Sequence, residues 1–301
     1  MNAISQNPSQ QQLNSLLEHY QSGRLGDAEK LAISITHEFP KHQFSWKVLG
    51  AILSQTGRSS EAVNAMHTAI ALSPNDAAAH YNLGVSLKEL GRLEDAEASY
   101  RQAIKIKPDY PEAHNNLGVI LQELGRLEDA EASYKQEIVF NPAYADAYWN
   151  LSSCEKTIRD SEHWIDKCLI ADANHWKAKL TKAALQFYQG NKEEFDNLMQ
   201  SKFNQNGYMR SFSWAFSLSH LPELHFNKWY FFNSIVKKSI TSKPFYEFGV
   251  WRASSFKYFI KIFKKGYGFD TFTGLPEDWV VGNHIEKKGT YSSDGNVPKI
   301  K

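Results

Sequence analysis

Two residues near the C-terminus combine a residue type and a spacing that suit nucleotide chemistry. Asp270 follows Gly249 by about 20 residues. In an open α/β sheet, a carboxylate at that distance beyond a glycine turn accepts hydrogen bonds from the hydroxyl groups of a ribose. Many α/β proteins place an acid at this point for structural reasons alone. The spacing therefore leaves a nucleotide site and a structural carboxylate both open.

The segment around these two residues predicts a strand–helix–strand unit. The apolar run 245–250 is typical of a buried parallel strand that stops at a glycine. Residues 254–264 predict a helix, because phenylalanine and isoleucine fall on one stripe and lysines on the other. A second strand at 267–270 ends in the carboxylate, and residues 271–276 follow as a loop.

A second set of candidate residues recurs along the chain at an interval of 34 residues. Asn82, Asn116 and Asn150 each precede a repeated leucine, a position that points partly into the groove of a stacked helical array. Amide side chains offer donors and an acceptor to the backbone of an extended peptide. Alternatively, these asparagines bond neighbouring helices of the array. Their joint replacement with alanine is expected to abolish partner capture and to leave the helical content intact.

Other residues beside these asparagines are expected to face the same groove. Their mixed polar and aromatic chemistry favours a polar peptide or a protein over a lipid. They are Lys47, Tyr81, Asn115 and Trp149, followed further along by Lys88, Gln122 and Lys156.

The elements that carry the asparagines come from an internal repeat. Residues 89–100 and 123–134 spell the same string, ELGRLEDAEASY, 34 residues apart. Each unit has a turn glycine between two helices, and a large leucine of the first helix faces a small alanine of the second, which lets the helices interlock. The repeated positions are Gly23, Gly57, Gly91 and Gly125 for the turn, Leu49, Leu83, Leu117 and Leu151 for the first helix, Ala28, Ala62, Ala96 and Ala130 for the second, and Pro40, Pro74, Pro108 and Pro142 at the unit ends.

This pattern resembles the tetratricopeptide family over residues 9–159. The resemblance implies an α-solenoid of antiparallel helix pairs that binds a protein or peptide in its concave groove. The expected organisation is a disordered N-terminus at 1–8, units at 9–42, 43–76, 77–110 and 111–144, a degenerate unit at 145–159, degenerate helices at 160–171, 174–189 and 191–201 within 160–201, and a separate segment at 202–301.

Composition and charge both change at about residue 202. The last hundred residues hold 23 of the 40 aromatic residues, which predicts a second packed core, with Trp214, Phe216, Trp229, Tyr230, Phe231 and Phe232 among its members. Residues 202–301 have a net charge of +8 and the preceding residues a net charge of −7. The contrast is compatible with docking between the halves, with an anionic ligand, or simply with solvated lysines. No nucleic-acid motif or dense arginine cluster is present, so nucleic acid is not a predicted partner.

The cysteine and histidine residues predict no metal or nucleophilic chemistry. Cys154 and Cys168 have no CxxC spacing and are expected to be buried thiols. His220 and His225 lie five residues apart, which is not the spacing of a helical metal pair. Two cysteines in a chain of this length fit a reducing compartment, and neither a signal peptide nor a long apolar run is apparent, so the sequence predicts a soluble cytoplasmic protein without a membrane partner.

The C-terminal segment resembles the macrocin O-methyltransferase group of S-adenosylmethionine-dependent methyltransferases over residues 221–301. The resemblance is carried by LPELHF, FYEFGVWRASS, GFDTFTGLPEDW and GTYSS, which begin at residues 221, 245, 268 and 289. It implies a Rossmann-like fold and S-adenosylmethionine as cofactor. The implied cofactor-binding residues are Glu247 and Gly249 in the first-strand motif, Arg252, Ala253, Ser254 and Ser255 in the following loop and helix start, and Asp270 at the ribose; the 274–276 and 289–291 segments would lie near the cofactor or the substrate entrance.

The resemblance also implies a larger sheet than these residues supply. A methyltransferase sheet of this kind has about seven strands, whereas two are recognisable here, and a two-stranded parallel unit leaves open edges. The family's metal-binding carboxylates and catalytic base have no counterparts in this sequence. The chain is therefore expected to be a fragment, a truncated reading frame or a subunit completed by another polypeptide, and to transfer no methyl group as it stands.

The sequence thus predicts a mainly α protein: a tetratricopeptide α-solenoid followed by a partial α/β, Rossmann-like methyltransferase segment. The first functional hypothesis is a scaffold that recruits a protein through its repeats. The alternative is the N-terminal portion of an O-methyltransferase that acts on a glycan or a small hydroxylated metabolite. Binding of S-adenosylmethionine distinguishes the two, and nothing in the sequence predicts an oligomeric state.

Overall fold

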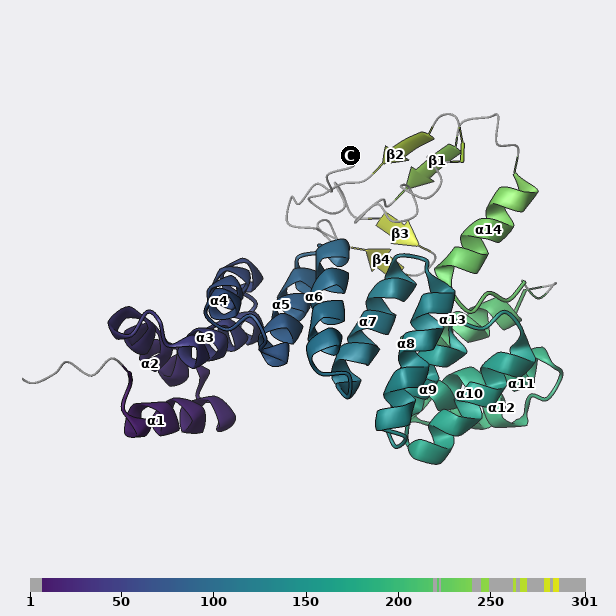
Figure 1. Cartoon of the computed structure of the whole chain (residues 1–301). Helices are drawn as coiled ribbons and strands as arrows, with labels where there is room; N and C mark the ends of the chain where they lie inside the picture. The colour runs from purple at the N-terminus through teal and green to yellow at the C-terminus, as the bar shows by residue number, and fades with distance from the viewer. Residues whose placement is uncertain are drawn as a thin grey trace, which may run out of the picture. The chain divides into compact units, whose positions relative to one another are not determined.

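The computed structural model describes residues 7–218, 221, 223–239, 245–248, 262–263, 266–269, 279–281 and 284–286. Most of the N-terminal segment 1–8, expected to be disordered, lies outside these residues. In the described part the chain is mainly helical, and it divides into two units, Met1–Phe226 and Asn227–Lys301 (Figure 1).

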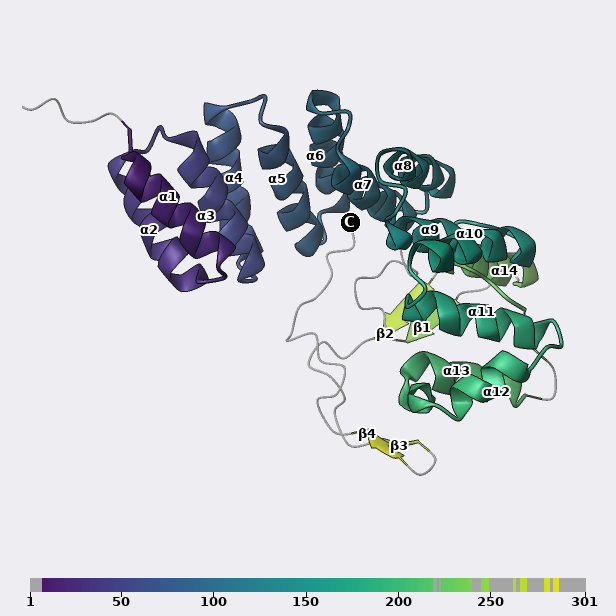
Figure 2. The ribbon, with the colours of Figure 1, turned by 90° about the horizontal axis from the view of Figure 1, so that it is seen from below.

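The first unit is a row of helices in which each helix packs against the next along the chain. Figure 2 shows the helices from α3 to α8 side by side in chain order. The strongest helix–helix contacts join α3 to α4, α5 to α6, α7 to α8 and α9 to α10, which is the pairing that the repeat predicts. The helices are α1 (Gln10–Gln21), α2 (Leu25–Glu38), α3 (Gln43–Gln55), α4 (Ser59–Leu72), α5 (Ala77–Glu89), α6 (Leu93–Ile106), α7 (Pro111–Glu123), α8 (Leu127–Phe140), α9 (Ala145–Ser152), α10 (Ile158–Ala171), α11 (Trp176–Tyr188), α12 (Glu193–Met199), the short 3₁₀ helix η1 (Lys202–Gln205) and α13 (Gly207–Phe216).

The turns inside the pairs follow from the repeated glycine. Gly91 has a φ of 72°, in the left-handed region that a side chain disfavours. Its N–H donates to the carbonyl of Lys88 at 2.9 Å, and the N–H of Arg92 donates to the carbonyl of Leu87 at 2.9 Å. These bonds satisfy the last carbonyls of α5, and the carboxylates of Glu94 and Asp95 then lie in the first turn of α6, where the helix dipole favours negative charge.

The core of the array is made by large side chains against small ones. Ala96 and Ala130 have no exposed surface, and Leu83 and Leu117 are buried in the same cluster. Gly84 makes room for the ring of Tyr100, because a Cβ on Gly84 would lie 2.7 Å from Cε1 of that ring. Neighbouring helices can therefore pack closely because glycine or alanine occupies these contact positions.

The array continues past the recognisable repeats with less regular helices. The eight-residue α9 packs against α10, and Ile165, Cys168, Ala178 and Leu185 join α10 and α11 in one cluster. The thiols of Cys154 and Cys168 are buried and free of disulfides, as the sequence predicts, and burial raises the pKa of each to about 12.

The aromatic residues of η1 and α13 that the structure describes in a cluster, Phe203, Phe212 and Phe216, pack on this array. The rings of Phe187 and Phe216 stack with centroids 4.2 Å apart, and Met209 is fully buried beside them. The first unit therefore extends to Phe226, beyond the change in composition. The expectation that Trp214 and Phe231 belong to the core is wrong: they are 68% and 48% exposed, since each lies on the outer face of its helix.

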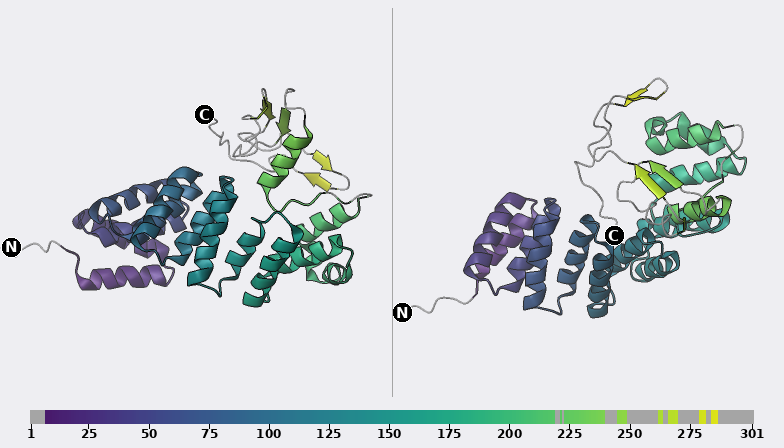
Figure 3. Two further views of the ribbon diagram at one scale, coloured as in Figure 1. Left: turned by 45° about the vertical axis from the view of Figure 1, so that its right-hand side comes forward. Right: turned by 90° about the horizontal axis from the view of Figure 1, so that it is seen from above.

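The second unit contains α14 (Lys228–Lys238) and four short strands. β1 (Phe245–Phe248) pairs in parallel with β2 (Gly266–Phe269), with Phe245 opposite Gly266 and Phe248 opposite Phe269. β3 (Trp279–Val281) and β4 (His284–Glu286), which the sequence did not predict, form a separate antiparallel pair. The described strands thus make two two-stranded sheets, and the predicted helix at 254–264 lies outside the described residues except for positions 262 and 263. Figure 3 shows both strand pairs from two further directions.

Candidate functional site

The candidate partner-binding residues lie on the first helices of consecutive pairs. Lys47 is on α3, Tyr81 and Asn82 on α5, Asn115 and Asn116 on α7, and Trp149 and Asn150 on α9, and all are half-buried. We call the surface made by these seven residues the ladder face. Their regular placement follows from the repeat, because each helix presents the same two positions to the same side.

Two of the amides join neighbouring helices. The Nδ2 of Asn116 donates to the hydroxyl of Tyr81 at 3.0 Å, and the Nδ2 of Asn150 donates to the Oδ1 of Asn115 at 3.0 Å. Each bond therefore spans from the first helix of one pair to the first helix of the next. The side chain of Asn82 makes no hydrogen bond within the described part of the chain. The structure thus contains the helix-to-helix bonding that the sequence left as an alternative, and it holds Asn116 and Asn150 in fixed orientations.

Lys47 is bound within the protein. Its Nζ lies 2.6 Å from the Oδ2 of Asp76, which also accepts from Gln43 at 2.8 Å, and the Oδ1 of Asp76 accepts from the N–H of Ala79 at 3.0 Å as the cap of α5. Burial raises the pKa of the Asp76 carboxyl, but the hydrogen bonds from Lys47, Ala79 and Gln43 outweigh burial and hold that pKa below its ordinary value. On α3, the N-terminal end of the ladder face, the charge of Lys47 is therefore already paired with that of Asp76.

One repeat later, aromatic rings replace that ion pair. Tyr81 occupies the position of Lys47 and Tyr110 that of Asp76, and their ring centroids lie 5.1 Å apart. Trp149 occupies the same position on α9 and contacts His175 at 5.6 Å between centroids. Burial raises the pKa of Tyr110 to about 12 and also raises that of Tyr81. The ladder face is therefore aromatic and amide-rich over α5, α7 and α9.

Carboxylates lie beside the far end of the ladder face. Glu112 and Asp146 are exposed in the first turns of α7 and α9, and Glu137 of α8 is only 2% exposed. Glu137 was not among the predicted site residues, although the repeat alignment carried the signal: the equivalent positions hold Ile35, Ala69 and Ala103. A carboxyl in a position that is apolar in the three preceding units marks a departure from packing requirements.

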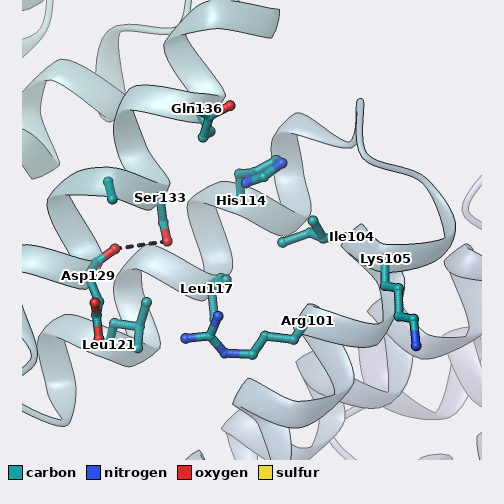
Figure 4. A pocket seen from close by; sticks show the side chains of 10 residues that line it. Arg101, Ile104, Lys105, His114, Leu117, Leu121, Asp129, Ser133 and Gln136 are labelled. Atoms are coloured by element: carbon teal, nitrogen blue, oxygen red, sulfur yellow. Dashed lines mark hydrogen bonds between the residues drawn. The ribbon is translucent and has the colours of Figure 1, made fainter.

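A cavity of about 400 Å³ lies elsewhere, between α6, α7 and α8 (Figure 4). Arg101 and Lys105 approach it from α6, Leu117 from α7, and Asp129 and Gln136 from α8. None of the candidate site residues lines this cavity, which uses other side chains of α7 than the ladder face does. The Ser133 hydroxyl on its wall donates within its own helix to the carbonyl of Asp129 at 3.0 Å.

The candidate cofactor residues fall mostly outside the described residues. Glu247 is in β1, where it pairs with Gly268 of β2. Gly249, Arg252, Ala253, Ser254, Ser255 and Asp270 all lie outside that part of the chain. Within the described residues, no group of histidine, cysteine, aspartate and glutamate side chains has an arrangement that would hold a metal ion. No described helix is long and apolar enough to cross a membrane.

Comparison with known proteins identifies the repeats. A family model described as "TPR repeat" matches residues 50–91 and 86–125. No curated protein matches the chain. The solved structure of Pseudomonas aeruginosa PilF is 15% identical, aligns over 67% of this chain and 95% of its own, and has a TM-score of 0.59. That of PilW, a widely conserved type IV pilus biogenesis factor, is 18% identical, with 68% and 99% covered and a TM-score of 0.59.

A further solved structure carries a stated binding property. YrrB, described as a TPR protein with an unusual peptide-binding site, is 17% identical and aligns over 58% of this chain and 92% of its own, with a TM-score of 0.51. At these identities the likeness concerns the fold. The residues that the family model matches, 50–125, lie within the helix pairs that the structure describes.

Proposed function

We propose, from the premise that this chain contains tetratricopeptide repeats, that it is a scaffold whose ladder face captures an extended segment of a partner protein. One observation carries the proposal: Asn116 and Asn150 are fixed by hydrogen bonds at the same position of consecutive pairs. Groups that are held before binding lose less conformational entropy when a ligand arrives. Among the similar folds, YrrB is described as having a peptide-binding site.

The spacing of the ladder suits an extended chain. Packed helices lie about 8–10 Å apart, and a β-strand rises about 3.3 Å per residue. One step of the ladder therefore matches about three residues of an extended peptide. Asn115 and Asn116 would meet one stretch of its backbone and Asn150 the next, while Tyr81 and Trp149 supply apolar contact to its side chains.

Selection of short random peptides against the immobilised protein tests this function. The triple variant Asn82→Ala, Asn116→Ala and Asn150→Ala is expected to lose the peptides that the unmodified chain retains, while circular dichroism shows the same helical content. Asn64→Ala is the matched control, because Asn64 is exposed on α4 and away from the first helices. Equal retention by the triple variant and by the control would reject the ladder face as the binding surface.

We propose as a second function that the second unit binds S-adenosylmethionine, which supplies a methyl group when bound. The supporting observation is the parallel pairing of β1 with β2, since parallel strands require a crossover connection and their carboxyl ends meet at one edge of a sheet. Phe248 and Phe269 pair at that edge, and Gly249 and Asp270 are the next residues in the sequence. The methyl acceptor would be a glycan or a small hydroxylated metabolite.

Calorimetric titration with S-adenosylhomocysteine tests the second function. The chain is expected to release heat with a saturating isotherm, and Asp270→Ala is expected to weaken binding through loss of the ribose contact. Lys299→Ala serves as a control for a change of charge outside the candidate cofactor residues. Absence of binding by the unmodified chain would reject this function and leave the scaffold proposal unaffected.

The chemistry of the thiols agrees with a cytoplasmic location, which we propose on that basis. Cys154 and Cys168 are buried and form no disulfide with each other. Free cysteines persist in reducing compartments, where disulfides are rare. Fractionation of cells that express the tagged chain would test the location directly.

A further inference from the structure

Glu137 is a buried carboxyl in a position where the three preceding units place isoleucine or alanine. Ala103 and Ala69, one and two repeats earlier, are fully buried. Glu137 is 2% exposed, and its Oε2 has no hydrogen-bond partner within the described part of the chain. A buried polar atom without a partner destabilises the folded state unless something satisfies it. Among the described residues, none supplies such a group.

The surroundings of Glu137 are acidic. Glu112 from α7 and Asp146 from α9 both interact with it electrostatically, and we call these three residues the acid cluster. Burial is the main cause that raises the pKa of Glu137 to about 8, and Glu112 and Asp146 raise it further. No lysine or arginine of the described chain counteracts these effects on Glu137.

Of the acid cluster, Asp146 alone has a described ion-pair partner, the ring of His175. The Nε2 of His175 lies 2.9 Å from its Oδ1. Glu112 makes no ion pair in the described part of the chain and is exposed in the first turn of α7. The cluster therefore presents two carboxyl groups without a cation, at the junction of α7, α8 and α9.

The acid cluster borders the ladder face. Tyr144, in the turn between α8 and α9, interacts electrostatically with Asp146, with Glu137 and with Tyr81 of the ladder face. It is 36% exposed. The pKa of Tyr144 is raised to about 12, chiefly by burial and then by the carboxyl groups of Asp146 and Glu137. A segment that lies along α7 and α9 would therefore pass the cluster.

We propose that Glu112, Glu137 and Asp146 bind one cationic side chain, lysine or arginine, of the segment captured on the ladder face. This inference rests on the proposed scaffold function and specifies its partner. Lysine and arginine have stems long enough to carry a charge from a bound backbone into a partly buried site. The ring of Tyr144 adds a cation–π contact at the entrance. The cation would satisfy the orphaned oxygen of Glu137 with a charge-assisted hydrogen bond.

The test compares random-peptide selection on the unmodified chain and on Glu137→Ala. Peptides retained by the unmodified chain are expected to share a lysine or arginine at one position. That basic position is expected to disappear from the peptides that Glu137→Ala retains, while preferences at the other positions persist. Glu137→Ala should fold, because Ala69 and Ala103 show that alanine fits this position of the repeat.

A synthetic peptide from the selection gives the quantitative measurement. Replacement of its basic residue by norleucine is expected to weaken binding to the unmodified chain about tenfold or more, and to leave binding to Glu137→Ala unchanged. Binding to the unmodified chain should also strengthen as the pH rises toward about 8 and Glu137 ionises, with Glu112, Asp146, Tyr144 and His175 as the other titratable groups around it. Glu137→Ala removes the part of this pH dependence that belongs to Glu137.

The possible outcomes separate the two proposals. Peptides that bind without a shared basic residue, equally on the unmodified chain and on Glu137→Ala, would overturn the cation site while leaving the scaffold function in place. Selection that yields no peptide at all would overturn both. Loss of the basic preference in Glu137→Ala with retained binding supports both.

Discussion

The ring of Tyr134 lies so close over Gly118 that a Cβ on the glycine would come within 2.5 Å of its Cε1. The same arrangement joins Gly84 to Tyr100 one repeat earlier, at 2.7 Å. These contacts are between rigid rings and the backbone of a neighbouring helix. At Gly50 the corresponding neighbour is the flexible end of Met66, which has other rotamers available.

Gly118→Ala is therefore expected to destabilise the protein by about 1–3 kcal/mol, because the ring of Tyr134 must shift in a packed core. Gly50→Ala should cost less, since Met66 moves more easily. Gly26→Ala is the control: Gly26 lies within α2 with open space around its Cα, and alanine there should stabilise the helix by about 0.5–1 kcal/mol. Urea unfolding followed by circular dichroism ranks the variants, and equal midpoints for Gly118→Ala and Gly26→Ala would contradict the steric argument.

Tyr100 and Tyr134, which occupy the same position of consecutive repeats, differ in the hydrogen bonds of their hydroxyl groups. The hydroxyl of Tyr134 donates to the Oε1 of Gln122 at 2.9 Å, whereas the buried hydroxyl of Tyr100 has no partner in the described part of the chain. Lys88 occupies the position of Gln122 in that repeat. Tyr134→Phe is expected to cost about 1 kcal/mol and Tyr100→Phe to be neutral or stabilising.

Lys88→Gln extends that comparison, since it should supply the missing acceptor for Tyr100 and stabilise the protein by about 0.5–1.5 kcal/mol. The gain should vanish when Lys88→Gln is combined with Tyr100→Phe. Additive effects of the two substitutions, measured as a double-mutant cycle in urea, would show that no such bond forms.

Glu137 should make the stability of the protein fall as the pH rises. Its pKa is about 8 in the folded protein and near 4.5 when exposed, so the folded state holds the extra proton between these values. The protonated carboxyl contributes its full stability below pH 4.5, and this contribution is lost as the pH rises to about 8. Glu137→Gln should be more stable than the unmodified chain by about 2–4 kcal/mol at pH 8.5 and equal to it at pH 4. Parallel pH profiles for the two proteins would contradict the raised pKa.

Asp76 should make the stability of the protein fall as the pH falls, opposite to the effect of Glu137. Its lowered pKa means that the ionised carboxylate stabilises the fold above the ordinary aspartate range, and that this stability is lost as the pH falls through the folded-state pKa. Asp76→Ala removes the cap of α5 and the partner of Lys47 together, at a cost of about 1–3 kcal/mol near neutral pH. Asp109→Ala, at the start of the next pair, is the comparison, because Asp109 is exposed and its side chain makes no described hydrogen bond. Similar unfolding midpoints for both variants would refute the role of Asp76.

The repeat in the sequence was sufficient to predict the helix pairs, because each pair depends on contacts within about 34 residues and on the same few positions. A glycine such as Gly91 ends one helix by its backbone conformation, and the acids that follow begin the next. The positions of the ladder residues on the first helices followed from the same periodicity, whereas the buried thiols were predicted from the lack of CxxC spacing. The strands β1 and β2 were also predicted close to their observed limits, from short apolar runs bounded by glycine.

Features that arise between neighbouring repeats required the tertiary structure. The sequence offered Asn116 two roles, and only the packing of α5 against α7 places its amide 3.0 Å from the hydroxyl of Tyr81. The packing of Phe216 against Phe187 carries the first unit beyond the change in composition. The repeat alignment shows that Glu137 occupies a position that is apolar in the preceding units, but its burial beside α7 and α9 becomes evident only in the structure. Local periodicity therefore determined the helices, whereas the burial and pairing of individual polar groups depended on which side chains the neighbouring helices bring to the same contact.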